Sequence, residues 1–379
     1  MQLLWGYPTL KMKGFSDLIL AILSLFWAVV RVGSDPQVPC LFIFGDSLVD
    51  NGNNNGMITL ARANYMPYGM DFSQGVTGRF SNGRTFVDVL AQLLGFPDFI
   101  PPFASTSGPA VLRGLNYGSG AAGIRGETGN NLGGHVSMDE QIGNFGRTLE
   151  EIRIYFGGNN YAVQAYLSKC IFFSGMGSND YLNNYFMPNY YRSTSDYSPS
   201  TFATVLIQDY SRQLTQLYNM GARKVVVTGL GRIGCIPYEM ARLNNNRNRN
   251  SSRCNESINN AILQFNSGLR RMVDRFNGGQ LPGAKFVYVD SYQSSNDLVV
   301  NAASYGFEVV DKACCGVGRN NGVITCLPLQ QPCNDRRKYS FWDSFHPSEA
   351  ANIIIANKSY SSKSRADVYP MNIQQLAMA

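Results

Sequence analysis

Short apolar runs with the length of buried strands alternate along this chain with longer stretches of helical periodicity. The strand candidates are residues 40–44, 115–124, 170–175, 224–228 and 285–290. Apolar residues recur at helical spacing in residues 82–94, 138–168, 202–218 and 258–276, and a last helix is expected to begin at Pro347. This alternation predicts a parallel sheet covered by helices on both faces. A closed barrel would need about eight strand–helix units, and this chain offers fewer.

The first 34 residues differ in character from the rest of the chain. Lys11 and Lys13 precede the mostly apolar stretch 18–30, and the small residues Gly33 and Ser34 follow it. This pattern is typical of a secretory signal, and the apolar stretch is too short to cross a bilayer; a retained N-terminal anchor is the weaker alternative. We therefore expect a signal peptide at 1–34, a single domain at 35–379, and a secreted, extracellular protein without a stable membrane anchor, with the cell wall as one destination.

Secretion makes disulfides the expected state of most of the eight cysteines. Six of them lie in polar, glycine-containing segments, and the 15 ways of pairing six cysteines stay open: Cys235, Cys254, Cys314, Cys315, Cys326 and Cys333. Cys40 and Cys170 lie in apolar runs and are expected to be free and buried. A zinc site in the cluster 314–333 is disfavoured, because the paired short spacings of zinc ligands are missing. We expect no metal and no cofactor.

The charge of the chain does not indicate a nucleic-acid binder. The formal net charge is +6, and removing Lys11, Lys13, Arg31 and Asp17 with the signal peptide lowers it to about +4. Two short basic clusters, at 247–253 and 336–338, lack interleaved aromatic residues and are better explained as solvated loops. Three Asn-x-Ser sequons predict glycosylation, at Asn250, Asn255 and Asn357. The oligomeric state stays open.

The first apolar run stops abruptly at Gly45-Asp46-Ser47. In an open α/β sheet, ligands bind outside the carboxyl ends of the strands, so Ser47 would face the ligand crevice. A serine in that position is a candidate nucleophile. The alternative is that Ser47 caps the next helix, which is a frequent role of serine.

Asp343 and His346 form a second candidate constellation near the C-terminus. A carboxylate three residues before an imidazole can accept the Nδ1 proton, which leaves Nε2 free to act as a base. Pro347 suits the first position of a helix, whose positive end favours a neutral imidazole. A purely structural pair is the alternative. The only other histidine, His135, lies in a glycine-rich loop without a preceding carboxylate, so His346 is the expected partner of Ser47.

Two further segments follow strand candidates and could supply hydrogen-bond donors. Residues 118–121, Gly-Ser-Gly-Ala, would expose backbone N–H groups, and residues 177–180, Gly-Ser-Asn-Asp, would offer the side-chain amide of Asn179. Donors of both kinds can stabilise an oxyanion. Each segment taken alone is equally a turn sequence.

Together these segments resemble a known family. Residues 44–48, Gly120, residues 177–180 and the pair Asp343-x-x-His346 are similar, in the same order, to the four conserved blocks of the GDSL (SGNH) hydrolases. The resemblance to the secreted plant-type GDSL esterase/lipases spans nearly the whole mature chain. It includes the segments 50–54 (Asp-Asn-Gly-Asn-Asn), 78–84 (Gly-Arg-Phe-Ser-Asn-Gly-Arg) and 231–237 (Gly-Arg-Ile-Gly-Cys-Ile-Pro).

The resemblance implies a fold, an activity and roles for individual residues. The fold would be a flavodoxin-like, three-layer α/β/α arrangement with a five-stranded parallel sheet. Ser47 would be the nucleophile, His346 the base and Asp343 its orienting carboxylate, with an oxyanion hole formed by the N–H groups of Ser47 and Gly120 and the side chain of Asn179. Gly118 is the alternative donor, because the second block often reads Ala-Ser-Gly-Gly. The activity would be hydrolysis of carboxylic esters of small molecules, lipids or glycans through an acyl-enzyme.

Three competing interpretations are weaker. Residues 229–234 match a dinucleotide-binding fingerprint, but they follow the fourth strand candidate and Pro237 interrupts the helix that this motif needs. An α/β-hydrolase is disfavoured because the chain contains no Gly-x-Ser-x-Gly. The alternative outside enzymology is a catalytically silent secreted glycoprotein that uses the same fold for binding.

Overall fold

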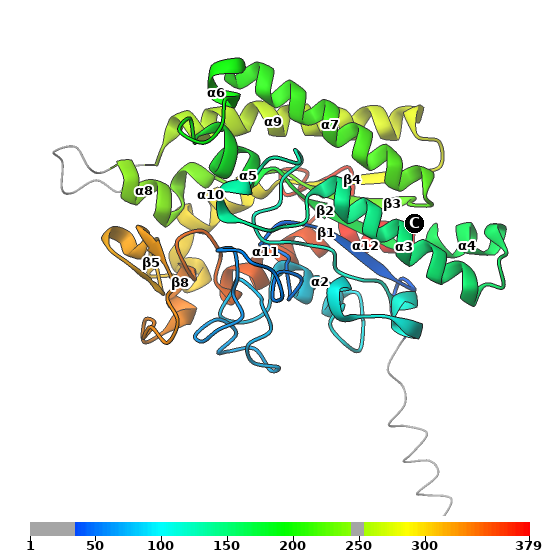
Figure 1. Cartoon of the computed structure of the whole chain (residues 1–379), viewed down its shortest axis with the longest axis horizontal. Coiled ribbons are helices and arrows are strands. Elements are labelled where there is room, and N and C mark those ends of the chain that lie inside the picture. Colours follow the sequence, from blue (N-terminus) through cyan, green and yellow to red (C-terminus); the bar gives the residue numbers. More distant parts are fainter. Residues whose placement is uncertain (1–34, 244–253) are drawn as a thin grey trace, which may run out of the picture. The chain divides into compact units, whose positions relative to one another are not determined.

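The computed structural model describes residues 35–243 and 254–379 and builds them around a five-stranded sheet (Figure 1). The expected signal peptide and the sequon at Asn250 lie outside the described residues. The sheet has the order β1-β2-β3-β4-β9, with β1 (Leu41–Gly45), β2 (Ile171–Gly175), β3 (Lys224–Thr228), β4 (Lys285–Val289) and β9 (Val368–Tyr369). The first four strands are parallel, and β9 pairs antiparallel with β4.

Residues 115–124 are not a strand, contrary to the sequence prediction. The segment lies along β1 through three backbone hydrogen bonds: Ile43 N–H donates to the Leu115 carbonyl, Tyr117 N–H to the Ile43 carbonyl and Ser119 N–H to the Gly45 carbonyl. Gly45 N–H, however, donates to the Gln141 side chain instead of to this segment, so the ladder is interrupted. The predicted five-stranded sheet is confirmed, and four of its strands are parallel as expected, whereas the short β9 is antiparallel.

Helices cover both faces of the sheet (Figure 1). On one face α3 (Met138–Tyr155), α7 (Pro199–Asn219) and α9 (Glu256–Arg275) share a core with Phe42 and Phe44 of β1. On the other face α2 (Phe86–Leu93), α11 (Glu349–Ser361) and α12 (Ile373–Met378) pack toward Leu41 and Ile43. Successive side chains of a strand point to opposite faces, so a strand buried on both sides must be apolar throughout. The predicted α/β architecture with two covered faces is confirmed.

Glycines and caps set the helix boundaries. The predicted helix 138–168 is two helices, α3 and α4 (Asn160–Leu167), because Gly157 and Gly158 between them adopt positive φ angles of 59° and 76°. The last long helix begins at Glu349 instead of Pro347, because the Ser348 side chain accepts from Ala351 N–H and caps it. None of the described helices is long and apolar enough to span a membrane.

The remaining elements are short and lie mostly at the carboxyl ends of the strands or beyond them. They are α5 (Ser178–Asp180), α6 (Ser193–Asp196), α8 (Pro237–Leu243) and α10 (Ser291–Val300), with two small sheets that pair β5 (Val309–Ala313) with β8 (Tyr339–Phe341) and β6 (Gly316–Val317) with β7 (Ile324–Thr325).

Four disulfides cross-link the chain: Cys40–Cys170, Cys235–Cys254, Cys314–Cys333 and Cys315–Cys326. The expectation that Cys40 and Cys170 are free is wrong. Leu41 of β1 pairs with Ile171 of β2, so the two preceding cysteines face each other with their Cα atoms 4.8 Å apart. That separation is within the range a disulfide requires. The pairing depends on strand register, which the apolar character of the two segments does not reveal.

We expect the double variant Cys40→Ala/Cys170→Ala to be clearly less stable than the wild type. The disulfide joins residues 130 positions apart, and removing such a cross-link releases a large loop in the unfolded chain. The expected loss in the free energy of unfolding is about 2–5 kcal/mol, measured by denaturant titration. The matched control is Cys235→Ala/Cys254→Ala, whose cysteines are 19 positions apart and whose loss should be smaller. An unchanged unfolding midpoint in the first variant would contradict the prediction.

Candidate active site

The end of β1 places Ser47 beside a solvent-open cavity. Gly45 is the last residue of the strand, and a side chain does not fit there, because a Cβ would lie 2.6 Å from Val49 Cγ2 and 2.8 Å from the Gly175 carbonyl oxygen. The Gln141 side chain of α3 forms two hydrogen bonds with the backbone of Gly45: it accepts from Gly45 N–H at 3.0 Å and donates to the Gly45 carbonyl at 2.8 Å. The chain then turns tightly, with Leu48 N–H donating to the Asp46 carboxylate. This turn presents the Ser47 hydroxyl to the cavity.

Ser47, His346 and Asp343 form one hydrogen-bonded chain. His346 Nε2 lies 2.8 Å from Ser47 Oγ, and His346 Nδ1 lies 2.8 Å from each carboxylate oxygen of Asp343. Ser47 and His346 are 299 residues apart in sequence, so only the fold brings them together. A hydroxyl bonded to an imidazole that is itself bonded to a carboxylate can lose its proton to Nε2 and act as a nucleophile.

Asp343 is held as a carboxylate although it is completely buried. Burial raises the pKa of Asp343, but the neighbouring His346 and hydrogen bonds from His346, Tyr68 and Phe345 N–H outweigh it, so the pKa lies below its usual value. The backbone N–H groups of Phe345 and His346 donate to Asp343 Oδ1 at 2.9 and 2.8 Å. An ionised Asp343 can orient the imidazole and stabilise its protonated form.

Tyr68 is a site residue that sequence reasoning missed. Its hydroxyl donates to Asp343 Oδ2 at 2.5 Å, from a loop 275 residues away in sequence. Burial, together with the nearby Asp343, raises the pKa of Tyr68 well above its usual value, so its hydroxyl stays protonated and can donate. Nothing in the sequence separates Tyr68 from the other tyrosines, because its role depends on a contact between distant loops.

The segment 78–84 supports the loop that carries His346. The Phe80 ring packs against the imidazole of His346 with 5.0 Å between ring centroids. The Asn82 side chain accepts from Glu349 N–H, the first residue of α11, at 2.9 Å. Trp342 N–H donates to the His346 carbonyl, which closes the loop on itself. These contacts give the 78–84 motif a structural role beside the site.

The backbone donors of the site differ from those expected. Gly120 N–H donates to Asp50 Oδ2 at 2.9 Å, and Gly118 N–H donates to Asn116 Oδ1 at 2.8 Å, so both expected donors are occupied within the protein. Ala121 lines the same cavity as Ser47 and adopts a positive φ of 69°. Among the described residues, none accepts a hydrogen bond from the N–H of Ala121 or of Ser47. The geometry therefore replaces Gly120 with Ala121 as the available donor.

Asn179 lies where the sequence predicted it, and its amide is oriented by neighbours. Its Oδ1 accepts from the Asn183 side chain at 2.7 Å, and its Nδ2 donates to the Ala122 carbonyl at 2.9 Å. An amide nitrogen carries two hydrogens, so one remains for a ligand in the cavity that Asn179 lines together with Ser47. Ser47 N–H, Ala121 N–H and this amide hydrogen can together bind an oxyanion.

Three buried carboxyl groups surround this arrangement. Asp46, Asp50 and Asp180 are nearly or completely inaccessible, and burial raises the pKa of each to about 6, against the hydrogen bonds that lower it. Asp180 accepts from the N–H groups of Ile124 and Arg125. These groups therefore fix loops beside the site and carry an elevated proton affinity.

The cavity around Ser47 has a volume of about 460 Å³ and is also lined by His346, Ala121 and Asn179.

Two other segments of the sequence do not fit a catalytic or dinucleotide-binding role. His135 does not line the cavity, and its Nδ1 lies 3.1 Å from the Gly133 carbonyl. The segment 229–234 does not open an α-helix, because only a short 3-10 turn, Ile233–Cys235, forms before α8 begins at Pro237. The dinucleotide-binding interpretation therefore lacks its structural context.

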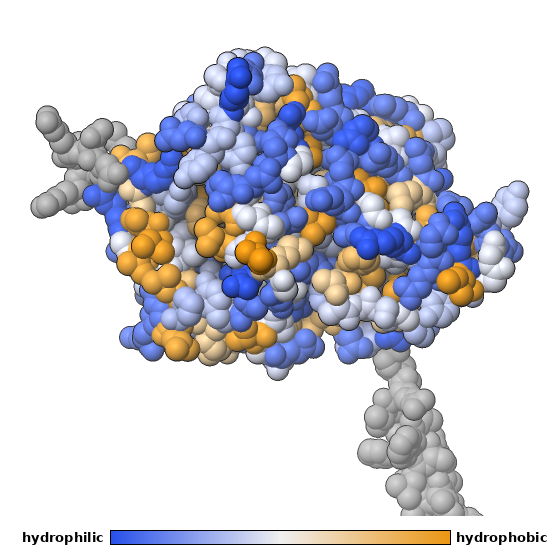
Figure 2. All heavy atoms as spheres, viewed as in Figure 1, coloured by the Kyte–Doolittle hydropathy of each residue, from blue (hydrophilic) through white to orange (hydrophobic). Residues whose placement is uncertain are grey.

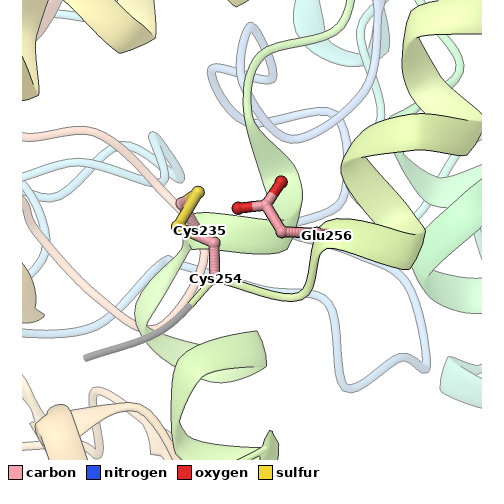
Figure 3. A group of neighbouring side chains, drawn as sticks. All are labelled: Cys235, Cys254 and Glu256. Carbon is pink, nitrogen blue, oxygen red and sulfur yellow. A yellow bond between two sulfur atoms is a disulfide. The ribbon is translucent and has the colours of Figure 1, made fainter. Parts of the chain in front are cut away.

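Cys235, Cys254 and Glu256 lie close enough together for a metal site, and Figure 3 shows their side chains. The two sulfur atoms are joined in a disulfide, so neither is a thiolate that could bind a metal ion. The cysteines at 314–333 are also paired in disulfides, which removes the ligands of the alternative zinc site.

Comparison with known proteins identifies the family of the chain. Residues 41–359 match the family described as GDSL-like lipase/acylhydrolase. The GDSL esterase/lipase At1g33811 of Arabidopsis thaliana is 64% identical over 361 residues, covering 95% of this chain and 97% of its own. GDSL esterase/lipases At5g45670 and At4g18970 of the same plant are 52% and 53% identical, covering 94% and 90% of this chain and 98% and 93% of their own. The chain therefore belongs to the GDSL-like lipase/acylhydrolase family.

Proposed function

We propose that this protein is a secreted carboxylic ester hydrolase that works through an acyl-enzyme on Ser47. The observation that carries the proposal is the continuous chain from Ser47 Oγ through His346 to Asp343, with 2.8 Å at each link. It lies beside a cavity large enough for a substrate. Membership of a family whose relatives are named esterase/lipases supports the same activity.

In the first half of the reaction, Ser47 Oγ attacks the carbonyl carbon of the ester and passes its proton to His346 Nε2. Asp343 stabilises the imidazolium through Nδ1. The negative charge that forms on the carbonyl oxygen is accepted by the N–H groups of Ser47 and Ala121 and the amide of Asn179. His346 then gives the proton to the departing alcohol, which leaves the acyl group on Ser47.

In the second half, water takes the place of the alcohol. His346 removes a proton from the water, the resulting hydroxide attacks the acyl carbonyl, and the same three donors stabilise the oxyanion. The intermediate collapses, the acid leaves, and Ser47 Oγ recovers its proton from His346. The cycle needs only groups that the chain itself supplies.

We further infer that residues 1–34 are a signal peptide and that residues 35–379 work as one secreted domain. Four disulfides suit an oxidising compartment. Asn255 is half-buried at the start of α9 and Asn357 is exposed on α11, and both are proposed glycan acceptors together with Asn250. A fall in mass after enzymatic deglycosylation tests their occupancy, and an unchanged mass would refute it.

Ser47→Ala is expected to lower kcat for p-nitrophenyl butyrate by roughly 10³-fold or more, because it removes the nucleophile and leaves only binding and oxyanion stabilisation. Initial rates of purified, folded protein give the measurement. Ser195→Ala, which changes an exposed serine, serves as the matched control and should retain wild-type activity. Equal activity of Ser47→Ala and wild type, or no activity of the wild type on a broad ester panel, would refute the proposed function in favour of a binding protein.

Tyr68→Phe is expected to lower kcat about tenfold, because a hydrogen bond to a charged group is worth roughly 1.5–3 kcal/mol. The hydrogen bond from Tyr68 lowers the pKa of Asp343, so its loss raises that pKa, and the acid limb of the kcat/KM profile should move to higher pH. The control is Tyr65→Phe, whose hydroxyl donates to the Cys326 carbonyl instead. The role assigned to Tyr68 fails if both variants keep the wild-type pH profile.

Asp46→Asn is expected to flatten the dependence of stability on pH. The pKa of Asp46 is raised by burial to about 6, so the folded state binds this proton more tightly than the unfolded state. The stability that this group contributes is present below about pH 4 and is lost as the pH rises to about 6. Asparagine keeps an acceptor for Leu48 N–H and carries no charge.

The variant should therefore exceed the wild type in stability at pH 7 by at most about 3 kcal/mol, the equivalent of two pKa units. Denaturant titrations at pH 4, 5, 6 and 7 measure the difference. The prediction is contradicted if the two proteins show parallel curves over this range.

A further inference from the structure

The segment 229–236 has no role in the chemistry described above, yet it lines a second cavity. This cavity has a volume of about 160 Å³ and lies at the carboxyl ends of β2 and β3. Five residues line both this cavity and the one around Ser47, so the two adjoin each other: Asp46, Leu48, Ser178, Ile233 and Phe345. Asp46 and Leu48 are the chain neighbours of Ser47. The second cavity therefore begins one residue away from Ser47 on either side in the chain.

The walls of the second cavity are mainly apolar and come from separate parts of the chain. Phe173 belongs to β2, Leu230 and Ile236 to the segment after β3, Phe341 to β8, and Ile355 to α11. Contact with such walls removes apolar surface from water without leaving polar groups of a ligand unpaired. The cavity therefore favours a hydrocarbon group over a sugar or a charged group.

Two of the glycines that line this cavity differ in the room that a side chain would have. A Cβ at Gly229 would lie 2.4 Å from Tyr288 Oη, so this position is restricted by its neighbour. A Cβ at Gly231 would meet nothing closer than Ser295 Oγ at 3.6 Å, and the backbone there is outside the left-handed region. The local structure thus tolerates a side chain at Gly231, and the side chain would take up space at the cavity wall.

We propose that the second cavity receives the acyl chain of the ester, while the alcohol portion stays in the cavity beside His346. The proposal rests on the proposed function of Ser47. The alcohol oxygen must lie near His346 Nε2, which protonates it, so the acyl chain is the part free to extend past Leu48 and Ser178. An apolar cavity of about 150 Å³ holds a molecule as large as benzene. The preferred acyl chain is therefore unbranched and about six carbons long.

The wild type should show a chain-length optimum. Each methylene buried in the cavity strengthens transition-state binding by up to about fourfold, and carbons beyond the end of the cavity add nothing or clash. On p-nitrophenyl esters, kcat/KM should rise from acetate through butyrate to hexanoate and fall for decanoate and palmitate. An optimum at palmitate, or no dependence on acyl length, would overturn the proposal.

Gly231→Leu should fill the cavity and lower the ratio of kcat/KM for hexanoate to that for acetate by about tenfold or more, as hydrophobic pockets discriminate between chains of different length. Gly126→Leu is the matched control, because Gly126 is exposed and a Cβ there meets nothing within 4 Å. It should keep the wild-type ratio. If Gly231→Leu instead discriminates among acetate esters by the length of the alcohol, the cavity holds the alcohol and the proposal is overturned.

Ile355→Ala tests the same cavity in the opposite direction, so the test does not depend on the folding of one variant. Shortening this wall residue should raise the ratio of kcat/KM for decanoate to that for hexanoate. Unchanged acyl-length profiles in both variants, with ester hydrolysis intact, would overturn the acyl cavity and leave the function of Ser47 standing. Failure of the wild type on every ester would instead overturn the proposed function itself.

Discussion

The buried carboxyl group of Asp50 connects the two loops on which the chemistry of this site depends. Its oxygens accept from the N–H groups of Gly52 and Asn53, close to Ser47, and from Gly120, in the loop that presents Ala121. A buried carboxyl group without hydrogen-bond donors strongly destabilises the folded state, so moving any of the three donors away would lower the stability. The proposed nucleophile and a proposed oxyanion donor are thereby held in one fixed relation.

The rest of the segment 50–54 strengthens this connection. The Asn53 amide donates to the carbonyls of Asn116 and Gly118, and the Asn54 amide donates to the carbonyls of Ala61 and Gly120. The segment thus satisfies the carbonyls of a loop that is too irregular to satisfy them in a sheet. Its polar residues are supports for the site, although their composition alone resembles a surface turn.

Much of this arrangement could be predicted from sequence because it depends on local pattern. The strands at 224–228 and 285–289 are short apolar runs, and the Asp343–His346 pair is contained in one turn of chain. With only two histidines, the partner of Ser47 could be found without a structure. The roles proposed for Ser47, Asp343 and His346 follow from their chemical types and their positions in the chain.

What could not be predicted depends on contacts between distant segments. Tyr68 donates to Asp343, which is 275 residues away in sequence, and Gly120 N–H donates to Asp50, which is 70 residues away. The N–H group available to the cavity is therefore that of the next residue, Ala121, whose positive φ angle is one that alanine seldom adopts. Neither periodicity nor composition predicts which N–H group stays free, because that depends on which acceptor lies nearest in the folded chain.

The pairing of β1 with β2 places a covalent bond and the reaction centre at opposite ends of the same two strands. The Cys40–Cys170 disulfide closes one end, while Gly45 and Gly175 face each other at the other end, next to the turns that carry Ser47 and Asn179. Sliding one strand along the other would carry the nucleophile away from the amide that faces its oxyanion, and the cross-link opposes that slip. The disulfide, whose Cys40 lies seven residues before Ser47, thus helps to keep Ser47 and Asn179 aligned.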